Sequence, residues 1–177
     1  MLRKRKALTK NECEDIINIF ETTSTPGMGE DEKREDEERG YTAVGGDLQR
    51  RKYVKLRNAL SDSLREYKMK NHFLSTIDNW YPCSRFNIQK YLPGNYYKPE
   101  HCEHGVYEES ARRIVAWMFY LNDIRNKGGT HWPQQNFTSK PRAGDLYIWP
   151  AGWTHTHYGI PTPNEIKYII TGWCVQV

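Results

Sequence analysis

Two stretches in the first 80 residues repeat their hydrophobic positions at helical spacing. In residues 10–21 the apolar side chains recur three or four positions apart, and Thr9 with Glu12 has the form of a capping box. Residues 53–70 show the same period. We therefore predict two amphipathic helices and expect the second to pack on one face of a sheet.

The segment between these helices contains almost no hydrophobic side chain. Residues 22–29 are rich in Thr, Ser, Pro and Gly, and residues 30–39 are almost entirely charged. Such a segment buries too little apolar surface to offset its ordering entropy. We predict a loop over residues 22–40 that is disordered without substrate, with a lid over the functional site as the minority hypothesis.

From Trp80 onward the pattern changes to that of strands. Residues 85–91 alternate between polar and apolar positions, residues 113–121 form the most apolar run, and residues 146–149 and 167–175 complete the set. Helices followed by many short strands predict a mainly β fold with flanking helices, in which an antiparallel two-sheet barrel is supported by the N-terminal helices.

One face of the strand predicted at residues 85–91 is polar. Arg85, Asn87, Gln89 and Tyr91 share that face, because side chains alternate along a strand. A polar row that points inward is costly for a core but suits the wall of a substrate groove. A solvated outer face is the alternative.

Length and composition set limits on the class of protein. A chain of 177 residues with 37% hydrophobic and 27% charged residues fits one globular domain. We expect residues 1–80 to provide helical support and the charged loop, and residues 81–177 to form the barrel core. The four cysteines lack metal-binding spacing, so we interpret them as free thiols.

Charge and hydropathy argue against some partners. The net charge of +4 is mild, and we interpret the basic clusters at residues 3–6 and 50–52 as solvated surface, so nucleic acid is not an expected partner. No apolar run is long enough to span a bilayer, and no apolar segment follows the basic N-terminus. We therefore expect a cytoplasmic protein without a membrane partner, and its oligomeric state stays open.

Two histidines and a carboxylate stand out as candidate metal ligands. His101 and Glu103 lie two positions apart, so both would leave the same face of an extended segment at residues 96–103. His157 could arrive from a distant strand, and His155 competes with it for this place. Two imidazoles and one carboxylate leave three octahedral positions open, which suits Fe(II).

The order of these elements carries a resemblance. The pieces QKYLPGNYYKPEHCEHG, WMFYLND, GGTHWP, KPRAGDLYIWP and HTHYGIPTPNEIKYIITGW follow one another between residues 85 and 174. In this order the chain resembles the Fe(II)/2-oxoglutarate dioxygenases, and within them the prolyl 4-hydroxylase-like branch. The resemblance implies a double-stranded β-helix, which is a jelly-roll or cupin-like barrel with helices behind one sheet.

The resemblance also implies a role for each site residue. His157 is preferred over His155 as the distal ligand because Pro161 follows it at the fourth position and Lys167 at the tenth. The resemblance implies that the metal is bound by His101, Glu103 and His157. It implies that Lys167 and Tyr120 bind the far carboxylate of 2-oxoglutarate, and that Tyr91 lies near the iron-chelating end of this cosubstrate. Thr171 and Trp173 are in phase with Lys167 and would line the same inner face as further cofactor-binding residues.

The implied reaction uses Fe(II), 2-oxoglutarate and O₂, with ascorbate as a further candidate cofactor. It would hydroxylate an unactivated C–H bond, first of all in a prolyl residue of a peptide or protein, and release succinate and CO₂. Glu103 departs from the family, where Asp is commoner, but a carboxylate oxygen still suits Fe(II). Lys167 gives a point charge where Arg would give a two-pronged contact.

The sequence leaves two other functional hypotheses open. One is a catalytically silent jelly-roll module that binds a peptide or a small molecule, and the other is a metal-dependent cupin that does not use 2-oxoglutarate. The combination of the metal ligands with Lys167 at the expected spacing counts against both. Substrate recognition is expected from residues 22–50, 104–112 and 131–139.

Overall fold

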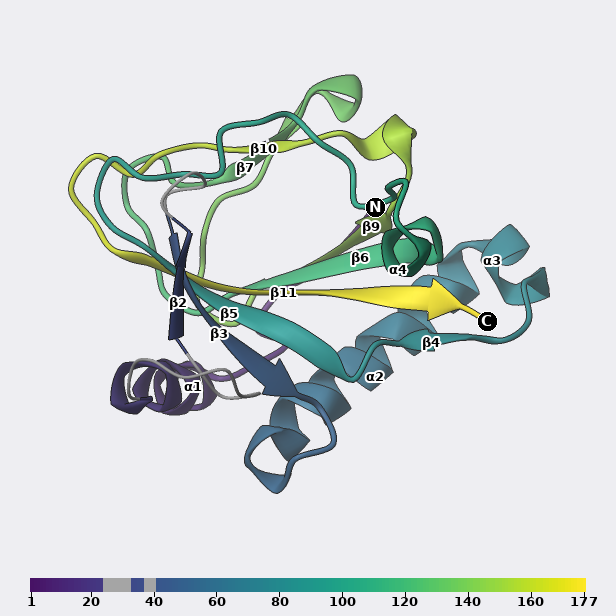
Figure 1. Cartoon of the computed structure of the whole chain (residues 1–177), viewed down its shortest axis with the longest axis horizontal. Coiled ribbons are helices and arrows are strands. Elements are labelled where there is room, and N and C mark those ends of the chain that lie inside the picture. Colours follow the sequence, from purple (N-terminus) through teal and green to yellow (C-terminus); the bar gives the residue numbers. More distant parts are fainter. Residues whose placement is uncertain (24–32, 37–40) are drawn as a thin grey trace.

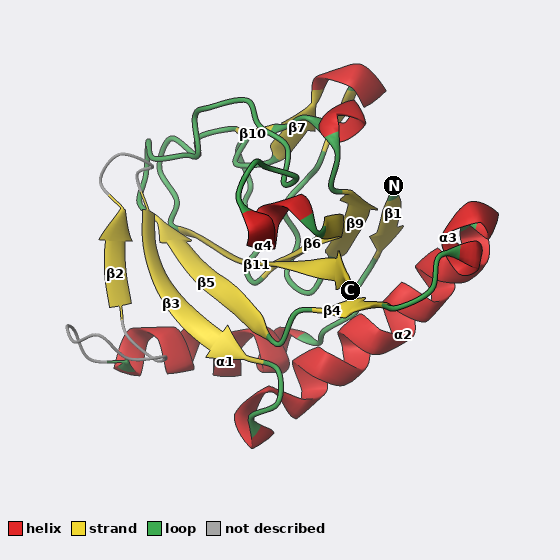
Figure 2. Cartoon of the chain, turned by 45° about the vertical axis from the view of Figure 1, so that its right-hand side comes forward, coloured by secondary structure: helices red, strands yellow, loops and turns green. Residues whose placement is uncertain are grey.

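The fold, a computed structural model, consists of two antiparallel sheets that face each other, with helices outside the larger one (Figures 1 and 2). The structure describes residues 1–23, 33–36 and 41–177. The helical elements are α1 (Lys10–Thr22), η1 (Arg51–Tyr53), α2 (Val54–Lys70), α3 (His72–Thr76), α4 (Glu108–Ala111), η2 (Pro133–Gln135) and η3 (Trp153–His155). The strands are β1 (Leu2–Lys4), β2 (Lys33–Asp36), β3 (Tyr41–Asp47), β4 (Trp80–Pro82), β5 (Arg85–Tyr91), β6 (Arg113–Tyr120), β7 (Thr130–Trp132), β8 (Phe137–Thr138), β9 (Leu146–Pro150), β10 (Tyr158–Gly159) and β11 (Lys167–Gln176).

The two predicted helices are confirmed as α1 and α2. Thr9 caps α1 through the expected reciprocal pair: its hydroxyl accepts from Glu12 N at 3.3 Å, and the Glu12 carboxylate accepts from Thr9 N at 2.9 Å. The apolar stripe of α1 and that of α2 both pack beneath the larger sheet, with Phe20, Leu56 and Leu60 almost fully buried. This layer forms the main hydrophobic core.

The larger sheet has the order β1-β9-β6-β11-β5-β3-β2, and β4 pairs with β11. The four strands predicted from hydrophobic pattern are all confirmed, as β5, β6, β9 and β11, and they are neighbours at its centre. The strand β3 and the edge strand β1 were not predicted. The prediction of a solvated cluster at residues 3–6 is wrong at Arg3, because β1 pairs with β9 and Arg3 contacts Asp145 at 2.7 Å.

Part of the predicted charged loop is also a strand. Residues 33–36 form β2, which pairs antiparallel with β3, so the prediction of a loop is wrong there. Residues 24–32 and 37–40 lie outside the described residues, and with them most of the segment on which the lid hypothesis rests.

Alternation along the central strands separates the core from a cavity. On β5, Phe86 and Ile88 face the helices, whereas Asn87, Gln89 and Tyr91 line the cavity. The polar row is therefore the wall of a cavity at these three positions, as the inward interpretation predicted. The same alternation continues on β11, whose buried residues are divided between the helix side and the cavity side.

The smaller sheet lies across the cavity from the larger one and has the order β10-β7-β8 (Figure 1). The segment predicted to be extended at residues 96–103 is not a strand. Its contribution to pairing is an isolated bridge between His101 and His157, whose backbone N–H groups donate to each other's carbonyl oxygens at 3.0 and 2.9 Å. This bridge brings together two segments that are far apart in the sequence.

Two glycines permit close packing around this framework. A Cβ atom at Gly129 would lie 2.1 Å from the carbonyl oxygen of Ser139, so only glycine permits this close backbone approach. A Cβ atom at Gly172 would lie 2.1 Å from the ring of Trp117, which is fully buried on the neighbouring strand β6.

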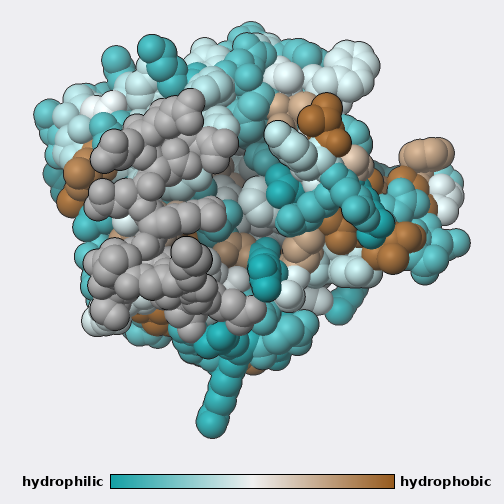
Figure 3. All heavy atoms as spheres, viewed as in Figure 1, coloured by the Kyte–Doolittle hydropathy of each residue, from teal (hydrophilic) through white to brown (hydrophobic). Residues whose placement is uncertain are grey.

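The surface is mostly hydrophilic in the view of Figure 3, with hydrophobic side chains gathered toward its right-hand side, where Figure 1 shows α3 and the C-terminus. Within the described part of the chain, no helix combines the length and apolar character needed to cross a bilayer.

Candidate metal centre and its cavity

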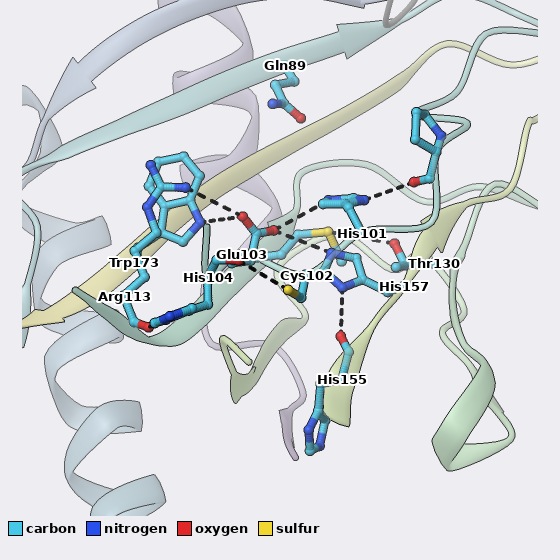
Figure 4. A network of polar contacts seen from close by, with 12 residues as sticks. Gln89, His101, Cys102, Glu103, His104, Arg113, Thr130, His155, His157 and Trp173 are labelled. Atoms are coloured by element: carbon cyan, nitrogen blue, oxygen red, sulfur yellow. Dashed lines mark hydrogen bonds and ion pairs between the residues drawn. The ribbon is translucent and has the colours of Figure 1, made fainter. Parts of the chain in front are cut away.

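Three predicted ligands meet at one point. The Glu103 Oε1 atom lies 3.7 Å from His101 Nε2 and 3.4 Å from His157 Nε2 (Figure 4). One ligand atom from each residue lies within 4.8 Å of the others. His157 is buried and the two others are partly buried. The sequence prediction of this trio therefore corresponds to a real convergence in space.

The backbone fixes the protonation of both histidines. His101 Nδ1 lies 2.9 Å from Pro99 O, and His157 Nδ1 lies 3.0 Å from His155 O. A carbonyl oxygen can only accept, so each Nδ1 must carry the proton that it donates. In the neutral imidazole, Nε2 then keeps its lone pair and points it toward Glu103.

This arrangement fits a cation. Two unprotonated nitrogens and a carboxylate oxygen are all electron-pair donors, and they would repel one another with nothing between them. Adjacent ligands of an octahedral ion at about 2.1 Å lie about 3 Å apart, slightly closer than the distances to Glu103 Oε1. Two imidazoles and one carboxylate on one face are the donor set that suits Fe(II) with open positions.

The surrounding loops hold these ligands in place. Glu103 N and His104 N both donate to Ala151 O, at 3.0 and 2.9 Å, which ties the first ligand segment to the end of β9. The carboxylate of Glu103 is affected by two opposing influences. Burial would raise its pKa, but hydrogen bonds and positive charge from His101 and His157, when their Nε2 atoms are protonated, lower that pKa well below its usual range. Glu103 is therefore a carboxylate at neutral pH.

His155 lies at the end of the short helix η3 and not beside the trio. Its ring Nδ1 contacts the Thr154 hydroxyl at 3.0 Å, and its carbonyl accepts from His157. The two histidines do not lie on one strand, because a 3₁₀ turn ends at His155. His157 is the histidine that joins the trio.

A cavity of about 380 Å³ opens beside the trio. Lys167 lies in its wall with 3% of its surface exposed, and burial lowers its pKa to about 8. Its Nζ atom lies 4.6 Å from the centre of the Tyr91 ring, and among the described residues no carboxylate pairs with it. A buried cation without an acidic partner is costly unless an anion reaches it.

The other predicted cofactor-binding residues differ in their position. Tyr91, Thr171 and Trp173 line the cavity, and the Tyr91 hydroxyl donates to Gln89 at 3.0 Å. Tyr120 is different, because its hydroxyl lies 2.6 Å from Ser139 Oγ and 3.2 Å from Thr130 Oγ1, and it is Thr130 that lines the cavity. Tyr120 is not among the residues that line the cavity, and its hydroxyl reaches the wall through Thr130; its direct contact with a cosubstrate stays a prediction.

Some cavity residues were missed by the sequence analysis. Thr130 directly follows Gly129, and Arg113 opens the most apolar strand. Trp149 packs its ring 5.2 Å from that of His157. The sequence offered two signals: a threonine after a pair of glycines, and a charged residue at the start of a buried strand. Neither signal shows whether the side chain points into the cavity.

Comparison with known proteins identifies the family. The model of the 2OG-Fe(II) oxygenase superfamily matches residues 86–175, which contain all three metal-ligand candidates and Lys167. The chain belongs to this superfamily. Its members are oxidoreductases that use Fe(II), 2-oxoglutarate and O₂, and the donor set described above fits that metal.

A sequence relative comes from Acanthamoeba polyphaga mimivirus and is provisionally named a prolyl 4-hydroxylase. The two are 27% identical over 118 residues, with 51% of this chain covered. The match spans 48% of the relative, so the chain corresponds to about half of that protein's length.

Solved structures share the fold across almost the whole chain. A viral collagen prolyl hydroxylase from Paramecium Bursaria Chlorella virus-1, in complex with 2-oxoglutarate, matches with a TM-score of 0.73 and 17% identity over 99% of this chain and 96% of its own. A prolyl-4-hydroxylase from Pseudomonas putida matches with a TM-score of 0.69 and 19% identity over 99% and 92%. These likenesses confirm the predicted double-stranded β-helix with flanking helices.

A third structure of the same fold contains a peptide. It is a prolyl hydroxylase from Trichoplax adhaerens bound to a fragment of the hypoxia inducible factor oxygen degradation domain. It matches with a TM-score of 0.69 and 19% identity over 99% of this chain and 83% of its own.

Proposed function

We propose that this oxygenase hydroxylates prolyl residues in a peptide or protein and releases succinate and CO₂. The observation that carries the proposal is the meeting of three electron-pair donors with a buried ammonium group in one cavity. The mimivirus relative and the structural relatives named as prolyl hydroxylases support the prolyl substrate. We propose that the chain works as a single catalytic unit, with residues 81–177 forming its core.

In this proposal His101, Glu103 and His157 hold the metal, which when bound supplies the oxidising chemistry. Each histidine is kept in the required tautomer by the carbonyl that faces its Nδ1 atom. The ligands therefore need little reorganisation on binding, because the backbone bridge between His101 and His157 already sets their separation.

The cosubstrate is held by its charge. Lys167 donates to the far carboxylate of 2-oxoglutarate in a charge-assisted contact that is strong because the site is buried. Thr130 and Thr171 offer hydroxyl groups in the same wall, and Tyr120 orients Thr130 from behind. Burial raises the pKa of Tyr120, so its hydroxyl keeps its proton at neutral pH.

Succinate release over a panel of proline-rich peptides and free amino acids tests the proposal. We expect release that requires Fe(II) and 2-oxoglutarate, is stimulated by peptides that contain proline, and disappears in His157→Ala. Stimulation by a free amino acid alone would overturn the peptide substrate. Absence of succinate with every substrate, in protein that binds metal, would favour the cupin or the silent binding module.

A further inference from the structure

The two oxygen atoms of Glu103 have different surroundings. Oε1 faces the two histidine nitrogens, whereas Oε2 accepts a hydrogen bond from the indole Nε1 of Trp173 at 2.6 Å. Figure 4 shows the carboxylate between the histidines on one side and Trp173 with Arg113 on the other. We propose that Trp173 and Arg113 are positioning residues that keep Glu103 a one-atom ligand, with Oε2 turned away from the metal. This inference rests on the proposed function, in which Glu103 binds the metal.

The extra methylene of Glu103 makes such a constraint necessary. A glutamate has one more rotatable bond than the aspartate that is commoner here, so its carboxylate can swing and present both oxygens to a metal. A hydrogen bond from a neutral N–H to a carboxylate is charge-assisted and directional. Because Oε2 is engaged by Trp173, rotation into a two-atom contact would break that bond in a buried site.

Trp173 is itself fixed from two sides. It lies on β11 opposite Ala116 of β6, one residue before the register shift between Cys174 and Val175. The guanidinium carbon of Arg113 lies 3.7 Å from the centre of the Trp173 ring, in a stacked cation–π contact. Arg113 Nη1 also lies 3.8 Å from Glu103 Oε2, so the same side chain adds positive charge beside the oxygen that faces away from the metal.

Whether Glu103 binds through one oxygen or two decides how many coordination positions stay open on the metal. In an octahedral site, two histidines and a one-atom carboxylate leave three positions for other ligands. A two-atom carboxylate would leave only two, which is too few for a chelating cosubstrate and O₂ together. Trp173 would therefore act on cosubstrate binding through Glu103, without being a metal ligand.

The test compares the parent protein with Trp173→Phe, using Mn(II) in place of iron. Water proton relaxation counts the exchangeable waters on bound Mn(II), and calorimetry gives the dissociation constant for 2-oxoglutarate. We expect about three waters in the parent and about one fewer in the variant, because the freed carboxylate takes a second position. The dissociation constant for 2-oxoglutarate should rise about tenfold.

The same substitution in a Glu103→Asp variant distinguishes a positioning role from a general disturbance of the cavity. In Glu103→Asp the carboxylate is one bond further from Trp173, so adding Trp173→Phe should leave the water count and the 2-oxoglutarate affinity of that variant unchanged. Arg113→Met should shift both readouts in the same direction as Trp173→Phe, but less. If Trp173→Phe folds poorly, Arg113→Met provides an independent measurement of the same effect.

The outcomes can be told apart from a failure of the proposed function. An unchanged water count together with unchanged 2-oxoglutarate affinity in both Trp173→Phe and Arg113→Met would overturn the positioning role. Mn(II) binding that survives in His157→Ala would instead overturn the metal site itself. Equal effects of Trp173→Phe in the parent protein and in the Glu103→Asp background would show that Trp173 does not act through the carboxylate.

Discussion

The carbonyl oxygen of His155 accepts a hydrogen bond from Nδ1 of His157 at 3.0 Å. Two histidines that lie two positions apart in the sequence therefore have different tasks. The backbone of the first fixes the tautomer of the second, and only the ring of His157 reaches Glu103. A short 3₁₀ turn that ends at His155 produces this difference.

Removal of each ring should separate these tasks. We expect His157→Ala to abolish Fe(II) binding, because a buried ligand is lost. His155→Ala should leave most of the binding, because its contribution comes from a backbone carbonyl that the substitution keeps. Anaerobic calorimetry with Fe(II) measures both. A larger loss in His155→Ala would mean that the distal ligand has been assigned to the wrong histidine.

Binding of 2-oxoglutarate should depend on pH through Lys167. Burial lowers the pKa of Lys167 to about 8, so its ammonium is charged below that pH and increasingly neutral above it. A carboxylate ligand prefers the charged form, and we expect affinity to be flat below about pH 8 and to fall about tenfold per pH unit above it. Calorimetry with Mn(II) present follows this. Lys167→Met should bind weakly at all pH values without that decline, whereas a parent curve that stays flat to pH 9.5 would contradict the assignment.

The same buried amine should reduce the stability of the protein. The unfolded chain holds the Lys167 proton up to its usual pKa of 10.5, and the folded protein only to about 8. Between these values the unfolded state binds more protons, so the stability of the parent rises with pH. The gap corresponds to about 3 kcal/mol at neutral pH. Lys167→Met should be more stable at pH 7 by up to this amount, with a gain that shrinks toward pH 10.

Urea unfolding at pH 7 and pH 9.5 measures that gain. Lys98→Met is the matched control, because Lys98 is exposed and its replacement should change the free energy of unfolding by less than about 0.5 kcal/mol. A Lys167→Met protein less stable than the parent at pH 7 would mean that the ammonium has a stabilising partner.

Gly172→Ala should destabilise the sheet. The added methyl group would meet the ring of Trp117 at 2.1 Å, and that ring is fully buried and packs edge-on against Phe119. We expect a loss of about 1–3 kcal/mol in the free energy of unfolding. Gly152→Ala is the control, since nothing lies within 4 Å of its added Cβ atom. Equal stability of the two variants in thermal unfolding would show that Trp117 can move aside.

The hydrophobic pattern was sufficient for the central elements. The strands β5, β6, β9 and β11 and the helices α1 and α2 have apolar faces long enough to define their period, and each was predicted within about two residues. The strand β3 was missed because its sequence YTAVGGD contains two glycines and too few apolar residues in alternation. The strand β1 has three residues, two of them basic, which conceals its pairing with β9.

The candidate metal ligands were predicted from the sequence for a different reason. The spacing of His101, Glu103, His157 and Lys167 carried the family resemblance, and the three candidate ligands meet in space although residues 96–103 do not form the strand that was expected. The roles of Thr130 and Arg113 could not be predicted, because they depend on which side chains meet across strands. The bond from Trp173 to Glu103 joins residues 70 positions apart and has no local signal.

Side chains along β11 alternate between the hydrophobic core and the cavity, and this alternation limits which substitutions the strand can accept during evolution. Gly172 accommodates the core ring of Trp117, and the next residue, Trp173, donates a hydrogen bond to the candidate metal ligand Glu103. One strand thus serves the hydrophobic layer and the metal site at successive positions, so a substitution there alters both. Residues 104–112 lie outside the larger sheet and none of them is buried, whereas Trp132 in residues 131–139 is fully buried and packs 5.7 Å from the ring of His157. New substrate preferences should therefore evolve first in residues 104–112, while the sheet remains almost invariant.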